Sequence, residues 1–300
     1  MTAANDPALQ DSPTESPVHS SAQPASTRAH RSIRVRPTVA LALVVVGFLA
    51  VAALAPGLLA THDPTALDLT ASLAAPSSEH WFGTDESGRD LYSRVVHGTR
   101  ESLTIGLGAA ALSLALALVL GALAALAGRF VSATVNRFVE ILFAFPTLLF
   151  ALLLVAILGP SATTQIVAVG VGSAPGYARI VRGQILAARR SGYVEAAIAL
   201  GHPRGVILRQ HVIPNAVRPL VAVFTLCVGQ SIVWASGLSF LGLGVAPPSS
   251  EWGALLDAGR AYVTHAPWLV VIPGLVIVTL ALAATAIGKD IQARLESGDS

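Results

Sequence analysis

Six long apolar runs constrain this chain more than any other feature of its sequence. A helix that crosses a bilayer needs about 20 mostly apolar residues, and each run comes close to that length. The runs cover residues 38–60, 103–127, 138–158, 164–181, 220–245 and 268–287. Charged residues make up only 12% of the chain, whereas a soluble domain carries about a quarter. The sequence therefore predicts an all-α integral membrane protein with six transmembrane helices.

The residues before the first run form a separate segment. Residues 1–37 are rich in Ser, Thr, Ala, Pro and Gln and show no apolar periodicity, which is typical of a disordered tail. The run at 38–60 is longer than the apolar core of a signal peptide, which has about 7–15 residues. We therefore expect a disordered cytoplasmic tail followed by an uncleaved first transmembrane helix.

Basic residues indicate the orientation of the chain. Cytoplasmic loops of membrane proteins carry an excess of Lys and Arg. When the amino terminus is placed inside, most of the 19 Lys and Arg residues fall on the inner side. The outer exceptions are Arg89, Arg94, Arg100 and Arg260. Both termini, the 186–218 loop and the tail at 289–300 are therefore expected in the cytoplasm, and residues 61–100 form an extracytoplasmic segment.

A polar, basic segment separates the fourth apolar run from the fifth. Residues 195–200 are mostly good helix formers. Gly201 can supply the positive φ that ends many helices, and Pro203 suits a first helical position because its missing N–H is not needed there. The sequence predicts two short helices that meet at a corner at Gly201. The second is expected to end at His211, with Pro214 as the next helix breaker.

This segment resembles the EAA loop of ABC-importer permeases, because Glu195-Ala196-Ala197 is followed by three residues and then by Gly201. The stretch from Tyr193 to Asn215 is similar to the C-type subunit of the dipeptide/oligopeptide/nickel family. In that family the loop is cytoplasmic, lies in a groove of the ATPase subunit and passes motion to the membrane helices. The alternative is an ordinary amphipathic connector between two spans. The resemblance assigns ATPase coupling to Glu195, Ala196, Ala197, Gly201, Arg204, Arg209, His211 and Pro214.

A second motif lies in the 61–100 segment, where Gly83-Thr84-Asp85 is followed by Gly88-Arg89-Asp90. It resembles the signature that precedes the second span in the same family. The two glycines permit tight turns, and the charged side chains of Asp85, Arg89, Asp90 and Arg94 can pair among themselves. The motif is expected to be structural, with direct substrate contact as the alternative. Its residues are Gly83, Thr84, Asp85, Gly88, Arg89 and Asp90.

A third stretch extends the resemblance toward the carboxyl terminus. Residues 238–244, Pro247-Pro248 and Trp252-Gly253 are similar to a motif of the same permeases. The resemblance therefore covers most of the chain after the first span. It implies a fold like that of type I ABC importers, in which the five helices over residues 101–288 form the permease core.

Motifs for covalent chemistry are absent from the sequence. It contains no nucleotide-binding glycine loop, no HExxH or CxxC motif and no GxSxG motif. We therefore expect no enzymatic activity and no cofactor in this chain, so that ATP is bound by partner subunits. The spans also hold almost no ionisable residues apart from Glu140, whereas ion-coupled carriers place such residues within the membrane. This argues for energy that is supplied from outside the membrane.

The resemblance implies a permease subunit of an ATP-driven importer in the bacterial cytoplasmic membrane, with peptides as the cargo. The implied partners are a second, B-type permease subunit, two cytoplasmic ATPase subunits, an extracytoplasmic substrate-binding protein and the lipid bilayer, without nucleic acid. Nickel chelates and other small solutes are the alternative cargo. A secondary transporter and an intramembrane enzyme are the alternative functions. The sequence leaves the residues that bind cargo unassigned.

Overall fold

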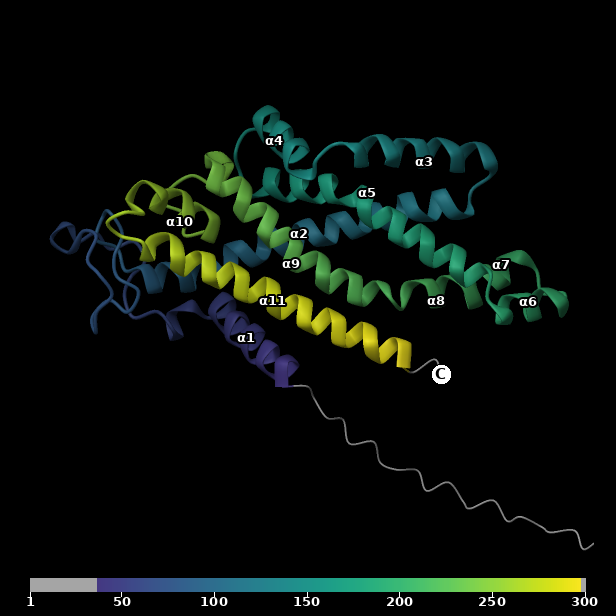
Figure 1. Ribbon diagram of the computed structural model, residues 1–300, viewed down its shortest axis with the longest axis horizontal. Coiled ribbons are helices and arrows are strands. Elements are labelled where there is room, and N and C mark those ends of the chain that lie inside the picture. The colour runs from purple at the N-terminus through teal and green to yellow at the C-terminus, as the bar shows by residue number, and fades with distance from the viewer. Residues whose placement is uncertain (1–36, 298–300) are drawn as a thin grey trace, which may run out of the picture. The chain divides into compact units, whose positions relative to one another are not determined.

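The computed structural model describes residues 37–297, so the tail predicted over 1–37 lies outside it except for Pro37. The described part is helical, and its isolated bridge joins Thr84 to Asp90. Figure 1 shows the longest helices running roughly side by side. These are α1 (Pro37–Leu54), α2 (Leu91–Leu126), α5 (Ala162–Arg189), α9 (Leu220–Leu238) and α11 (Trp268–Ser297). The predicted all-α class is confirmed.

The helices that are suited to a membrane match the predicted runs with two qualifications. Within residues 37–297, four helical stretches are long and apolar enough to cross a bilayer. They are Pro37–Leu54, Leu91–Leu126, Leu220–Leu243 and Trp268–Leu295. A fifth is reached when the bent pair of α3 (Arg129–Ala144) and α4 (Thr147–Leu158) counts as one span. The remaining predicted span, at 164–181, lies in α5, which is 28 residues long but holds polar residues such as Gln165 and Arg179.

The third apolar run is not one straight helix. α3 and α4 meet at an angle of 88°, and the break falls at Phe145-Pro146. Phe145 has φ −81° and ψ 131°, which is extended backbone. The residue before a proline is pushed out of the helical region by the proline ring. The prediction of a continuous span over 138–158 is therefore wrong at this point.

α2 begins earlier than the predicted start at residue 103. The Asp90 carboxylate accepts a hydrogen bond from Ser93 N at 2.8 Å and caps the helix, which begins at Leu91. α2 is 36 residues long as a result. The first turns of α2 therefore belong to the 61–100 segment.

The two ends of the chain also differ from the predicted boundaries. The run at 38–60 forms a shorter helix, because α1 ends at Leu54 and a 3₁₀ turn, η1 (Pro56–Leu58), follows it. At the other end, the first residues of the predicted tail continue α11 as far as Ser297. Residues 298–300 lie outside the described range.

α2 and α5 approach each other closely through glycine. A Cβ atom at Gly121 of α2 would lie 2.7 Å from the Val181 Cβ atom and 2.8 Å from the Ala178 carbonyl oxygen of α5. Only glycine fits at that separation, and small residues allow membrane helices to pack in this way. The close packing of α2 against α5 therefore depends on this glycine.

Gly121→Ala should lower the free energy of unfolding by about 1–3 kcal/mol, because the added methyl group forces α2 away from α5. The measurement is the melting temperature of the full-length chain in detergent. Gly183→Ala is the matched control, because Gly183 lies in α5 and a Cβ atom there would meet no atom within 4 Å. Equal melting temperatures for the two variants would contradict the packing.

Candidate functional site

The 61–100 segment is organised around the carboxylate of Asp85. Its Oδ1 atom accepts hydrogen bonds from Ser87 N at 2.8 Å and Arg89 N at 3.0 Å. Its Oδ2 atom pairs with Arg89 Nε at 2.7 Å and with the guanidinium of Arg94. Asp85 and Arg94 are both buried, so the carboxylate is fully hydrogen-bonded inside the protein. The predicted pairing of Asp85 with these arginines is confirmed.

Arg94 connects this segment to a loop that is distant in the sequence. Its Nη2 atom donates to the Ser249 carbonyl oxygen at 3.0 Å, and the Ser249 hydroxyl donates to Glu101 at 2.7 Å. Arg94 is buried, and Asp85 is its carboxylate partner. The buried guanidinium therefore depends on Asp85 to compensate its charge.

Gly83 and Gly88 shape the turns of this segment, with φ values of +76° and +73°. A Cβ atom at Gly83 would lie 2.6 Å from the Ala74 carbonyl oxygen, and one at Gly88 would collide with the carbonyl of Asp68. Thr84 is buried, and its hydroxyl oxygen accepts a hydrogen bond from Ala74 N at 2.8 Å. Each glycine is therefore required both by its positive φ and by the close approach of another segment of backbone.

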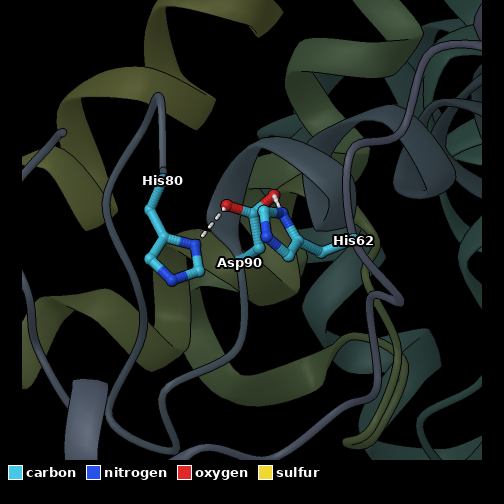
Figure 2. Close-up of side chains that lie close together, drawn as sticks. All are labelled: His62, His80 and Asp90. Carbon is cyan, nitrogen blue, oxygen red and sulfur yellow. Dashed lines mark hydrogen bonds and ion pairs between the residues drawn. The ribbon is translucent and has the colours of Figure 1, made fainter. Parts of the chain in front are cut away.

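Asp90 is the exception to the predicted pairing with arginine. Its carboxylate lies beside two histidines, as Figure 2 shows. His80 Nδ1 lies 3.0 Å from Asp90 Oδ1, and His62 Nδ1 lies 3.8 Å from Asp90 Oδ2. The carboxylate is buried and also caps α2, so its position is fixed by the start of that helix.

Glu251 is absent from the predicted site residues, although it is buried beside this network. Its carboxylate caps α10 (Trp252–Gly259) by accepting hydrogen bonds from Gly253 N at 2.9 Å and Ala254 N at 2.8 Å. Burial raises the pKa of Glu251. An acidic residue just before a helix is a recognisable start signal. Its burial could not be read from the sequence, because it depends on contact with α2, where Trp252 Nε1 donates to the Val95 carbonyl oxygen at 3.0 Å.

Asp85→Asn should destabilise the chain by about 3–5 kcal/mol, because it leaves the Arg94 charge buried without its partner. The expected result is a marked loss of folded protein, measured as the yield and melting temperature of the full-length chain in detergent. Glu86→Gln is the control. The Glu86 side chain pairs with Arg89 Nη2 at 3.0 Å and is 30% exposed, so its loss should cost about 0–1 kcal/mol.

Normal assembly of Asp85→Asn together with altered solute selectivity would contradict this prediction. The segment would then contact the cargo, and its role would not be structural.

The second region is the hairpin at residues 192–217, which follows α5. Its first helix is α6 (Gly192–Ala199), and Gly201 turns the chain with φ +78°. Gly201 N donates to the Ile198 carbonyl oxygen at 3.0 Å, and His202 N donates to the Ala197 carbonyl oxygen at 3.1 Å. This pair of bonds is a Schellman motif, which closes the carboxyl end of a helix. The predicted turn at Gly201 is confirmed.

The second half of the hairpin differs from the prediction. Pro203 is the residue before the helix and not its first position, because α7 begins at Arg204. The helix does not end at His211. It continues through a π-helical turn, η3 (Leu208–Val212), into α8 (Ile213–Val217).

Pro214 does not break this helix. A proline ring normally collides with the carbonyl oxygen four residues earlier and removes one hydrogen bond. Here the wider π turn precedes it, in which Ile213 N donates to the Leu208 carbonyl oxygen, five residues back. Pro214 then lies in the first turn of α8, a position where proline is tolerated.

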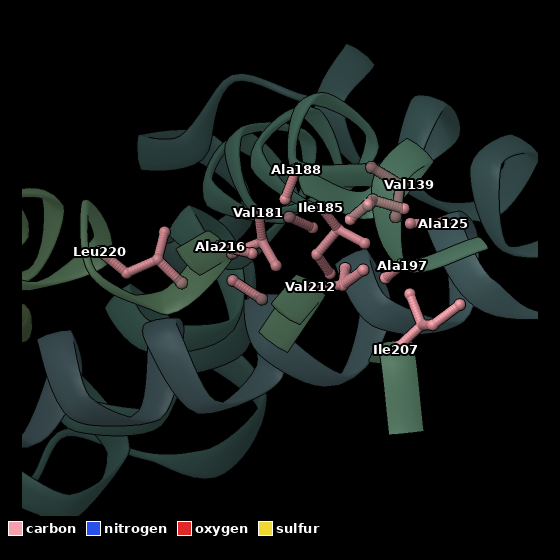
Figure 3. Close-up of a cluster of buried hydrophobic side chains, with 13 residues drawn as sticks. Ala125, Val139, Val181, Ile185, Ala188, Ala197, Ile207, Val212, Ala216 and Leu220 are labelled. Carbon is pink, nitrogen blue, oxygen red and sulfur yellow. The ribbon is translucent and has the colours of Figure 1, made fainter. Parts of the chain in front are cut away.

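One face of the hairpin is packed into the body of the protein. Val194 and Ala197 of α6 are buried, as are Ile207 and Val212 from the second half. They share one hydrophobic cluster with residues of α5, and Figure 3 shows much of this cluster. The α5 members include Val181, Ile185 and Ala188. The hairpin is therefore attached to the end of α5 by apolar packing.

A polar contact joins α5 to α2 at the same place. Arg189 Nη1 donates to the Ala125 carbonyl oxygen at 2.9 Å, in the last turn of α2. A cation near the carboxyl end of a helix is favoured by the helix dipole. The ends of α2 and α5 are therefore linked directly beneath the hairpin.

The other face of the hairpin is exposed and mixes apolar and charged side chains. Ile198 is 61% exposed and Leu200 is 78% exposed. Glu195, Arg204 and Arg209 are exposed as well. A cavity of about 690 Å³ opens beside them, and His202 and Arg204 form part of its lining.

The residues that the resemblance assigns to coupling are divided between these two faces. Glu195, Ala196, Gly201, Arg204, Arg209 and Pro214 are exposed. Ala197 is buried, and His211 is partly buried, with its ring centroid 6.4 Å from that of Tyr193. The sequence motif therefore combines residues that fix the hairpin with residues that remain free for another molecule.

Comparison with a known family gives a match over the hairpin and most of the long helices. The family model described as "Binding-protein-dependent transport system inner membrane component" matches residues 117–297. The match contains the whole hairpin at residues 192–217, and it begins within α2, after the 61–100 segment.

Named relatives are similar over nearly the whole chain. The chain is 39% identical over 259 residues to a probable D,D-dipeptide transport system permease protein of Escherichia coli K12, covering 86% of this chain and 87% of the relative. It is 36% identical to a dipeptide transport system permease protein of Alkalihalophilus pseudofirmus, with 85% and 83% covered. It is also 36% identical to a glutathione transport system permease protein of Pectobacterium atrosepticum, with 89% and 88% covered.

Solved structures of ABC transporters share the fold. An inward-facing conformation of the MetNI methionine ABC transporter has a TM-score of 0.51 at 20% identity, covering 66% of this chain and 96% of that chain. An amino acid ABC transporter with histidines has a TM-score of 0.54 at 18% identity, with 67% and 94% covered. At these identities the similarity concerns the fold alone.

Proposed function

This chain belongs to the family of binding-protein-dependent transport system inner membrane components, and we propose that it is a permease subunit of an ATP-driven peptide importer. The named relatives are described as transporting dipeptides, D,D-dipeptides and glutathione, which supports peptides as the cargo. Such a subunit forms half of the translocation path and makes or breaks no covalent bond.

The two-faced hairpin at residues 192–217 is the observation that carries the coupling role. A segment that transmits force must move as one body with the helices that it drives. The buried face of this hairpin packs on the end of α5, and Arg189 ties α5 to the end of α2. The Schellman motif at Gly201 fixes the angle between its two halves.

The exposed face of the hairpin supports docking to a partner. Ile198 and Leu200 would be buried by a groove that covers the turn. Glu195 lies in the first turn of α6, where it can form a charge-assisted pair with a partner's arginine. Arg204 and Arg209 can pair with partner carboxylates in the same way. The proposed partner at this face is a cytoplasmic ATPase subunit.

The remaining partners and the orientation follow from the same proposal. The complex contains two ATPase subunits, a second, B-type permease subunit and an extracytoplasmic binding protein. The chain crosses the bacterial cytoplasmic membrane several times, with both termini and the hairpin in the cytoplasm. The excess of arginine in and around the hairpin supports this orientation.

Gly201→Asp should insert normally but uncouple ATP hydrolysis from transport. A Cβ atom at Gly201 meets no atom of this chain within 4 Å, so the substitution causes no internal collision. The positive φ costs a residue with a side chain about 1–2 kcal/mol, and the added carboxylate points into the space that the ATPase would fill. The measurement is ATPase co-purification and substrate-stimulated hydrolysis in proteoliposomes. Glu195→Ala should have a weaker effect of the same kind.

Gly128→Asp is the matched control. Gly128 lies between α2 and α3, has an ordinary φ of −60°, and is also free of atoms within 4 Å of an added Cβ. It should retain coupling. Gly201→Asn separates the effect of backbone strain from that of the added side chain, because asparagine tolerates a left-handed conformation but still adds a side chain. Full stimulated hydrolysis and transport by Gly201→Asp would leave the hairpin as an ordinary connector.

The orientation is tested by labelling single cysteines in intact cells. On a Cys227→Ser background, Arg260→Cys should react with an impermeant thiol reagent from outside. Arg204→Cys should react only after the membrane is opened. Both arginines are exposed, so access and not burial decides the result. Labelling of position 204 from outside would refute the proposed orientation.

A further inference from the structure

Three side chains that could hold a metal ion meet at the outer end of the described helices. They are His62, His80 and Asp90, and Figure 2 shows both imidazole rings beside the Asp90 carboxylate. One ligand atom from each residue lies within 4.8 Å of the other two. The residues come from three separate segments: the chain after α1, the loop before Gly83 and the N-cap of α2. The proposed coupling mechanism uses none of them.

We propose that His62, His80 and Asp90 form a binding site for a divalent first-row transition metal, with zinc as the best match. Imidazole nitrogen and carboxylate oxygen are both zinc ligands, with bonds of about 2.0–2.2 Å. Tetrahedral geometry with such bonds places neighbouring ligand atoms about 3.3–3.5 Å apart. His80 Nδ1 lies 3.0 Å from Asp90 Oδ1, and His62 Nδ1 lies 3.8 Å from Asp90 Oδ2. One ligand atom from each of the three residues lies within 4.8 Å of the other two, so metal binding requires the three side chains to close in by about 1 Å.

The carboxylate is held in position by groups outside the ligand set. Asp90 Oδ2 accepts hydrogen bonds from Ser93 N at 2.8 Å and Thr61 Oγ1 at 3.4 Å. Within the described structure, the hydrogen bond at Asp90 Oδ1 is with His80 Nδ1. Partners of this kind orient metal ligands and tune their affinity. The Thr61 hydroxyl also lies 3.0 Å from His62 Nδ1, and that contact would be exchanged for the metal.

The site is accessible from one side. The His62 side chain is 37% exposed, whereas Asp90 is nearly fully buried. A cavity of about 610 Å³ adjoins it and is lined by His62, Asp63 and His97, among others. Three protein ligands leave a fourth position of a tetrahedral ion for water or another small ligand. Magnesium and calcium fit poorly, because they prefer oxygen ligands to imidazole.

A metal here would fasten a part of the chain that has little regular structure. Between α1 and α2 the helical elements are the short 3₁₀ turns η1 and η2 (Leu69–Ala71). A disulfide within the chain is impossible, because Cys227 is the sole cysteine. Metal ligation would join the end of α1, the loop and the start of α2 at one point, and binding energy of this kind stabilises the fold directly. The competing explanation is that the two histidines only donate hydrogen bonds to Asp90.

The test uses the full-length chain, purified in detergent through a tag without histidine and stripped with a chelator. Zinc chloride is then added, and bound zinc and melting temperature are measured after gel filtration. We expect one zinc ion per chain and a higher melting temperature with zinc, but not with magnesium chloride. His62→Asn and His80→Asn should each weaken zinc binding by at least about tenfold.

Asparagine is chosen because its amide N–H can replace the hydrogen bond from Nδ1 while removing the imidazole. His97→Asn is the control, because His97 Nδ1 contacts the Ser93 carbonyl oxygen at 2.9 Å and lies outside the cluster. It should bind zinc as the wild type does. Equal zinc binding by His80→Asn and the wild type, or the absence of stoichiometric zinc in the wild type, would overturn the proposal.

A second measurement keeps the test valid if a histidine variant fails to fold. In membrane vesicles of the wild type, zinc should protect His62 and His80 from carbethoxylation, as read by mass spectrometry, and leave His97 reactive. Unchanged modification of His62 and His80 in the presence of zinc would also overturn the site.

Discussion

The close packing of α2 against α5 is the constraint on which the rest of the described structure depends. α2 begins at the Asp90 cap beside the Asp85–Arg94 pair and ends beneath the 192–217 hairpin. Gly121 allows the two helices to approach at a distance that excludes any side chain. The two polar regions therefore lie at opposite ends of α2. In the proposed coupling mechanism, a displacement of the hairpin would act on the linked ends of α2 and α5.

The Asp85–Arg94 network at the start of α2 fixes the shape of the 61–100 segment more than it adds to the net stability of the fold. A buried ion pair contributes little net stability, although the loss of one partner is costly. Asp85 is saturated by four donors, and Arg94 continues the network to Ser249. Trp268 Nε1 also donates to the Thr84 carbonyl oxygen at 3.3 Å, which ties α11 to the same segment. The start of α2 and the segment before it are thus held by contacts from the Ser249 loop and from α11.

Local features of the fold and site could be predicted from the sequence, and features set by distant contacts could not. The turn at Gly201 and the pairing of Asp85 with Arg89 depend on residues a few positions apart, so the pattern of residue types was sufficient. The two prolines show where local patterns fail to predict the structure. The chain bends by 88° at Pro146, whereas the helix continues past Pro214 because a π turn precedes it. Glu251 and the division of the hairpin into two faces depend on packing against α2 and α5, which no local pattern records.

The central claim is that the exposed face of the hairpin docks on a cytoplasmic ATPase. Photo-crosslinking from a reactive amino acid placed at Ile198, 61% exposed in this chain, tests it most directly in membranes that contain the whole transporter. The account predicts a covalent adduct with the ATPase subunit, identified by mass spectrometry. An adduct only with lipid or with another membrane subunit would contradict it.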